Sequence, residues 1–166
     1  MTSVDDVEHP ELQAMLSYWR ARRRDGRLPG RRDIDPLDFP QQLPRVALVE
    51  VLEEPQGPNF RYRLAGTEIA ARAGRDPTGK RFDQLYVGAY LDQALATYRA
   101  IVEGRRPHFS HRTYPLVEGR EHLEYSRLIL PLAADGKRVD MLWLIAADLK
   151  RVGQEASSPT FDPHNP

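Results

Sequence analysis

Cysteine is absent from the 166-residue chain. Its absence excludes disulfide frameworks, cysteine-ligated zinc, iron–sulfur clusters and thiol nucleophiles in one step. Long apolar runs are absent too, and none approaches the ~18 residues that a membrane-spanning helix needs. The acidic start, MTSVDDVEHPEL, lacks the basic-then-apolar layout of a secretory signal. We therefore expect a cytoplasmic protein, and the length suits one domain.

Net charge is absent as well, because 24 Lys and Arg residues balance 24 Asp and Glu residues. The balance breaks down between Arg20 and Arg32, where seven arginines accompany a single acid. Such a stretch would suit nucleic acid or another polyanion. No DNA-binding helix pair is visible, so we favour a solvated helix face, with Arg31 pairing Asp33 or Asp35 to fasten the linker. Nucleic acid is therefore not an expected partner.

Hydrophobic periodicity and turn residues predict the order helix, two strands, helices, three strands. Pro10 suits the first position of a helix that ends near Asp25, and Gly26 suits its C-cap. Both faces of the last strand are apolar, which predicts a place in the middle of an antiparallel sheet. These features indicate an α+β domain. The expected helices cover 10–25, 67–74 and 89–103, and the expected strands cover 46–52, 60–64, 107–114, 122–132 and 138–147.

Several motifs, in this order, resemble a family of short, stand-alone bacterial PAS-like proteins. The matching features are Trp19 in the first helix, LPGRRDIDP (28–36), RYRLAGTE (61–68), Gly74 with the Thr78-Gly79 turn, and YSRLILPL (125–132). The resemblance covers about residues 15–148.

The resemblance implies a PAS-like five-stranded antiparallel sheet with a helical insert between strands 2 and 3 and an N-terminal helix. Together with the proline, serine and polar content of the last residues, the resemblance divides the chain into an N-terminal helix and linker packing on the domain (1–44), the PAS-like domain (45–149) and a tail expected to be disordered (150–166). It also implies sensing of a small molecule or docking onto signalling partners. It brings no catalytic residues with it.

Motifs that would carry chemistry fail on spacing or context. GRDPTGKR (74–81) is one residue short of a P-loop, because Arg81 stands where a Ser or Thr would hold magnesium. His108 and His111 are three apart on an expected strand, so they point to opposite faces, which disfavours a metal site. PAS domains usually place a haem ligand in the long helix, and residues 89–103 contain no histidine. Haem, metal and a flavin–thiol adduct are therefore not expected, and the cofactor is left unassigned.

A ligand cavity in a PAS-like fold lies between the inner face of the sheet and the helical insert. Arg61 and Arg63 should stay outside because burying a charge is costly, so the alternate residues should point inward. Tyrosines are informative candidates, since a buried hydroxyl needs a partner and could orient a ligand. The alternative is that these side chains only fill the core. The candidate pocket residues are Phe60, Tyr62, Leu64, Phe82, Tyr86, Leu95, Tyr98, Ser126, Leu128 and Leu142.

An apolar stripe on the first helix consists of Leu12, Met15, Leu16 and Trp19. It either packs on the domain or pairs with a second copy, and the resemblance favours a homodimer. We expect a sensory or binding module of cytoplasmic signalling, which binds a small molecule non-covalently and docks a signalling partner. The alternatives are a ligand-free interaction scaffold, a homodimeric adaptor, or an enzyme on the same fold. We expect no enzyme activity.

Overall fold

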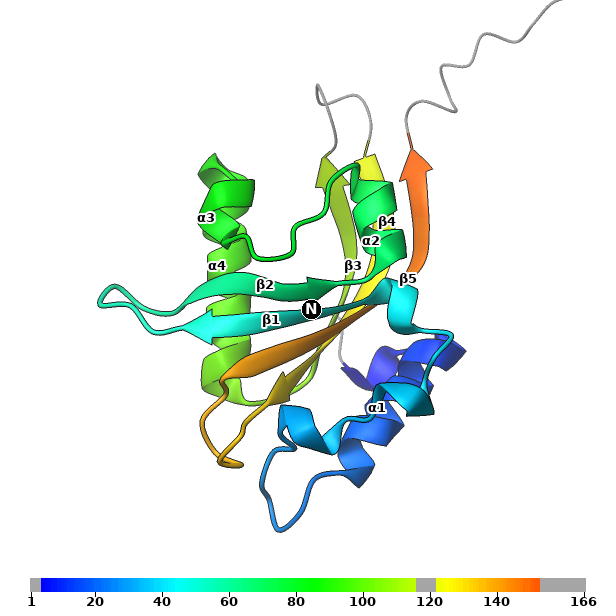
Figure 1. The fold of residues 1–166 in the computed structure, drawn as a ribbon, viewed down its shortest axis with the longest axis vertical. Helices are drawn as coiled ribbons and strands as arrows, with labels where there is room; N and C mark the ends of the chain where they lie inside the picture. Colours follow the sequence, from blue (N-terminus) through cyan, green and yellow to red (C-terminus); the bar gives the residue numbers. More distant parts are fainter. Residues whose placement is uncertain (1–3, 116–121, 153–166) are drawn as a thin grey trace, which may run out of the picture.

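A computed structural model describes residues 4–115 and 122–152. Its five strands pair antiparallel in one sheet, in the order β2-β1-β5-β4-β3 (Figure 1). The strands are β1 (Val46–Leu52), β2 (Asn59–Ala65), β3 (His108–Pro115), β4 (His122–Leu132) and β5 (Met141–Val152). β5 lies at the centre, as its two apolar faces predict. The expected α+β, PAS-like sheet is confirmed.

The helical elements lie before β1 and between β2 and β3, as the sequence predicts (Figure 1). The α-helices are α1 (Pro10–Ala21), α2 (Thr67–Ala73), α3 (Phe82–Leu85) and α4 (Gly88–Gly104), and the 3₁₀ turns are η1 (Val4–Asp6), η2 (Arg31–Asp33), η3 (Pro36–Asp38) and η4 (Leu43–Arg45). Within the described residues, no helix is both long enough and apolar enough to cross a membrane.

Helix α1 ends earlier than predicted. Its last residue is Ala21 rather than Asp25, and the chain turns back between Arg24 and Arg27. Asp25 and Gly26 occupy the turn with φ values of 53° and 74°. A left-handed conformation at both central residues is what an Asp-Gly turn of the primed type requires. Gly26 thus serves a tight turn and does not cap the helix.

The apolar stripe of α1 packs on the sheet. All four of its side chains are buried within the single chain: Leu12, Met15, Leu16 and Trp19. The indole Nε1 of Trp19 donates a hydrogen bond of 2.9 Å to the carbonyl of Pro131 in β4. Tyr18 and Phe39 pack against Trp143 of β5, with ring centroids 5.9 Å and 5.1 Å away. These four side chains are therefore not available to a second copy, which corrects their assignment to a dimer helix.

The two faces of the sheet are separated by the alternation of each strand. On β5, Trp143 packs on the α1 side, whereas Leu144 and Ala146 lie on the side covered by α2–α4. We call the second side the inner face. Strand β5 also continues to Val152, so the segment 150–152, expected in a disordered tail, is paired with β4. The rest of that expected tail lies outside the described residues.

A β-bulge interrupts the predicted alternation of β2. Leu48 of β1 pairs with Leu64, but the next residue, Val49, pairs with Tyr62. Arg63 is thus an extra residue, and it reverses the side to which Leu64 points. Leu64 is 47% exposed, so the prediction that it points into the pocket is wrong.

Candidate functional site

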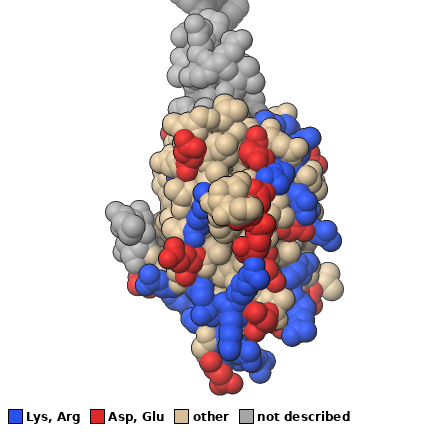
Figure 2. Space-filling view, turned by 90° about the vertical axis from the view of Figure 1, so that its left-hand side faces the viewer, with Lys and Arg blue, Asp and Glu red and all other residues tan. Residues whose placement is uncertain are grey.

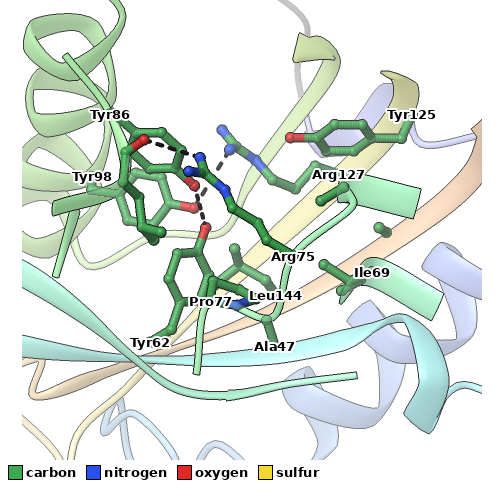
Figure 3. A pocket seen from close by; sticks show the side chains of 13 residues that line it. Ala47, Tyr62, Ile69, Arg75, Pro77, Tyr86, Tyr98, Tyr125, Arg127 and Leu144 are labelled. Atoms are coloured by element: carbon green, nitrogen blue, oxygen red, sulfur yellow. Dashed lines mark hydrogen bonds between the residues drawn. The ribbon is translucent and has the colours of Figure 1, made fainter. Parts of the chain in front are cut away.

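A cavity lies between the inner face of the sheet and the segment from α2 to α4 (Figure 3). Its cavity volume is about 80 Å³, within a wider hollow of about 680 Å³ that includes open solvent. The lining residues come from β1, β2, β4, β5, α2, α3, α4 and the loops beside α3. They are Ala47, Tyr62, Ile69, Ala73, Arg75, Pro77, Leu85, Tyr86, Tyr98, Tyr125, Arg127, Leu144 and Ala146.

Tyrosines form one wall of the cavity. The hydroxyls of Tyr62 and Tyr86 are hydrogen-bonded at 2.9 Å. Burial, followed by the neighbouring Tyr86 and Tyr98, holds the pKa of Tyr62 well above its ordinary value. Behind this wall, Phe82 packs edge-to-face on Tyr98 with centroids 4.8 Å apart, and Phe60 lies 5.3 Å from the same ring. The Tyr62 hydroxyl is therefore neutral near pH 7, and the aromatic rings behind the wall pack closely against it.

Arg127 of β4 brings a charge into the lining. Its side chain is buried, with 7% of the residue exposed. Nη1 donates a long hydrogen bond of 3.4 Å to the Tyr98 hydroxyl, and the guanidinium carbon lies 5.3 Å from the centre of that ring. Figure 3 shows the guanidinium reaching toward Tyr98, with the Tyr125 hydroxyl directed to the same region. The atoms Nε and Nη2 are buried and have no hydrogen-bond partner among the described residues.

Further donors lie next to Arg127 on strand β3. Ser110 pairs with Arg127 across the two strands, and Arg112 pairs with Tyr125. The Ser110 Oγ and the Arg112 Nε are also buried without a hydrogen-bond partner in the described part of the chain. Burial, and after it the charges of Arg127 and Arg112, lowers the pKa of His108. The inner face of β3 and β4 is therefore an electropositive, incompletely bonded region.

The fold and the cavity are joined by a match to a known protein family. A family model described as PAS domain matches residues 7–146, from just before α1 to the middle of β5. The chain belongs to the PAS domain family. The match confirms the expected family, and it makes the chain a sensory or interaction module. No curated protein matches the chain.

Five predicted pocket residues lie in or beside the cavity of this PAS domain. Tyr62, Tyr86 and Tyr98 line it, and Phe60 and Phe82 are buried in the aromatic base behind it. The sequence thus located the aromatic wall.

The other predicted pocket residues lie elsewhere. Ser126 and Leu128 belong to the positions of β4 that alternate with Arg127, so they face the α1 side, and their assignment to the pocket is wrong. Leu142 is buried on the inner face but outside the lining, and Leu95 packs partly buried against the core. Sequence reasoning also missed Arg75, Tyr125 and Arg127.

The other motifs of this PAS domain have structural roles. The loop between α2 and α3, which resembles a P-loop, follows the edge of β2: Gly79 donates to the carbonyl of Tyr62, and Tyr62 donates to that of Lys80. It leads into the four-residue α3 rather than a long helix. The His111 Nδ1 lies 3.3 Å from the Ser126 Oγ, but this exposed pair is on the face opposite the cavity. Among the described residues, no three His, Asp or Glu side chains could hold a metal ion together.

The arginines between Arg20 and Arg32 largely fasten the linker. Arg22 stacks on Tyr18 at 3.2 Å and pairs with Asp38 at 3.3 Å. Arg31 donates to the carbonyl of Ile34 instead of pairing with the expected aspartates. In Figure 2, Lys and Arg side chains gather toward the end of the molecule where α1 and the β4–β5 turn lie, with acidic side chains among them. This mixture fits the expectation of a solvated basic face.

Proposed function

We propose that this PAS domain is a ligand sensor, which binds a small molecule non-covalently in the cavity between its inner face and α2–α4. The observation that carries the proposal is Arg127, a buried cation in the lining with unbonded donor atoms. A core that served packing alone would be filled with apolar side chains, because a buried polar group without a partner is costly. The apolar walls and few polar groups of the cavity also match the usual make-up of small-molecule sites.

The proposal assigns the domain to binding and not to catalysis. The titratable groups of the lining are tyrosines and arginines; among them Tyr62 and Tyr86 are hydrogen-bonded to each other, and Arg127 donates to Tyr98. PAS domains commonly mediate protein interactions, so the proposal includes a protein partner that receives the binding event.

Native mass spectrometry of the protein purified from its own host tests the proposal, together with thermal shifts against a metabolite library. Ala73 of α2 lines the cavity and is half-buried, so Ala73→Phe should block ligand entry without rebuilding the core. Ala71 is exposed on the same helix, which makes Ala71→Phe the matched control. We expect bound ligand in the wild type and in Ala71→Phe, and none in Ala73→Phe. A wild-type protein without bound ligand, whose thermal shifts equal those of Ala73→Phe, would refute the proposal.

A further inference from the structure

The charge of Arg127 is not neutralised by the described part of its own chain. The residue is 7% exposed, yet its bonding is limited to Tyr98, and no carboxylate of the described residues pairs with it. Buried cations in proteins are normally paired, because an uncompensated charge in a low-dielectric interior is costly. By contrast, Arg81, whose side chain is 34% exposed, has two carboxylate partners, Glu54 and Asp83. Arg127 is more deeply buried than Arg81 and yet has no carboxylate partner among the described residues.

The unbonded atoms of Arg127 form a recognition edge. Nε and Nη2 are neighbours on one side of the planar guanidinium, and both lack a partner among the described residues. Two N–H groups in this arrangement match the two oxygens of a carboxylate in a bidentate pair. The contact with the Tyr98 hydroxyl uses Nη1 and leaves that edge free. Arg127 therefore presents the donor half of a bidentate ion pair, and the described residues supply no carboxylate acceptor for it.

The surroundings limit what can complete this pair. The lining beside Arg127 includes the apolar side chains of Ile69, Leu85, Leu144 and Ala146. These walls suit a hydrocarbon or aromatic body. A phosphate dianion would carry a second charge and a third oxygen. Ser110 and Arg112 lie outside the lining, and Arg75, the second arginine of the lining, donates to the carbonyl of Leu85.

We propose that the ligand is a small organic acid whose carboxylate pairs with Nε and Nη2 of Arg127 and whose apolar body lies against Ile69, Leu144 and Ala146. The inference rests on the proposed function, because it requires that the cavity be a ligand site. It adds the chemical class of the ligand and names the residue that selects it.

The test uses matched probes on the full chain. The acids are benzoate, phenylacetate and hexanoate, and each is compared with its neutral amide by ¹H–¹⁵N NMR titration at millimolar concentration. We expect the best acid to bind at least about tenfold more tightly than its amide, since a hydrogen-bonded charge pair exceeds a neutral contact by this much. Arg127→Met should abolish the preference, and Arg127→Lys should retain only part of it. Arg63→Gln, which removes an exposed arginine, should change nothing.

A second readout concerns the neighbouring His108. The positive charges of Arg127 and Arg112 contribute to the lowering of the His108 pKa. An anion bound to Arg127 would offset part of this charge and should therefore raise the His108 pKa. A purely structural role for Arg127 would leave the His108 titration unchanged on addition of acid.

The outcomes separate this inference from the proposed function. Equal binding of acids and amides to the wild type would overturn the inference and leave a small-molecule site in place. Inorganic phosphate binding as tightly as the organic acids, with the same dependence on Arg127, would also overturn it, because a general anion site needs no apolar body. If no acid binds at millimolar concentration, the inference fails. The proposed function then stands or falls on the ligand found in the protein from its own host.

Discussion

Replacing Arg127 by methionine should make the ligand-free protein more stable. Methionine has a similar reach, needs no hydrogen bond and fills irregular space. The wild type buries a guanidinium that is 7% exposed, with two nitrogens unbonded and one long contact of 3.4 Å to Tyr98. Each orphaned donor costs about 1–3 kcal/mol, and part of this is returned by the stacking on Tyr98. We therefore expect the free energy of unfolding to rise by about 1–3 kcal/mol.

Urea unfolding followed by tryptophan fluorescence measures this change. Trp19 and Trp143 are both 1% exposed, so their emission should report the loss of the core from the α1 side of the sheet. For a domain of this size, each kcal/mol corresponds to about 2–4 °C in Tm. Arg127→Lys keeps the buried charge and serves as the control, for which no stabilisation is expected. If Arg127→Met is less stable than the wild type by more than about 1 kcal/mol at an unchanged urea m-value, Arg127 is a satisfied structural residue and the reasoning fails.

Two further predictions concern acid stability and close packing. The pKa of His108 is lowered in the folded state from 6.5, so its contribution to stability is fully present above about pH 6.5 and lost as the pH falls through the folded pKa. His108→Gln should therefore flatten the stability profile below about pH 6.5 in urea unfolding at a series of pH values; an unchanged slope would contradict this. Gly66→Ala should cost about 2–3 kcal/mol in the same assay, because the added Cβ would lie 2.3 Å from the Pro44 carbonyl oxygen, whereas Gly104→Ala meets nothing within 4 Å and should gain up to about 1 kcal/mol. Equal effects of the two alanines would refute the packing argument.

Alternation and turn residues predicted the strands better than the faces they present. The order of the elements and the central place of β5 follow from local pattern. The inward face of β4 does not, because its apolar residues lie on both sides. From the sequence alone, Ser126 and Leu128 could face inward as well as their neighbours could. Their actual face depends on the packing of α1 on the sheet, which is a long-range contact that local pattern does not show. Leu64 failed for a different reason: the bulge at Arg63 leaves no mark in a sequence that keeps alternating.

Arg127 was missed because a single arginine in a strand usually marks an exposed position. A signal was nevertheless present in the sequence. Arg127 directly precedes the apolar run Leu128–Leu130, whose side chains fall on both faces of the strand, so this part of the strand has no face marked as solvent-facing. A charged residue at such a position is buried whichever face it takes. The same reasoning extends to Tyr125, which lies two residues before Arg127 in β4, but it could not have found Arg75, which lies in the loop after α2.

The two faces of this sheet show that the unbonded donors are not a general failure of packing. On the α1 side, the one polar atom of Trp19 is matched to the Pro131 carbonyl at 2.9 Å, and aromatic rings fill the remaining space. On the inner side, Ser110, Arg112 and Arg127 carry four of the five buried side-chain atoms that the described residues leave unbonded. The fifth is Nδ1 of His9, at the start of α1. The same sheet thus provides a hydrogen-bond partner for the buried Trp19 indole on its α1 side, but none for Nε and Nη2 of Arg127 on its inner face. Under the proposed function, an anion in the cavity would offset the cost concentrated around Arg127 and would couple ligand binding to the stability of the sheet.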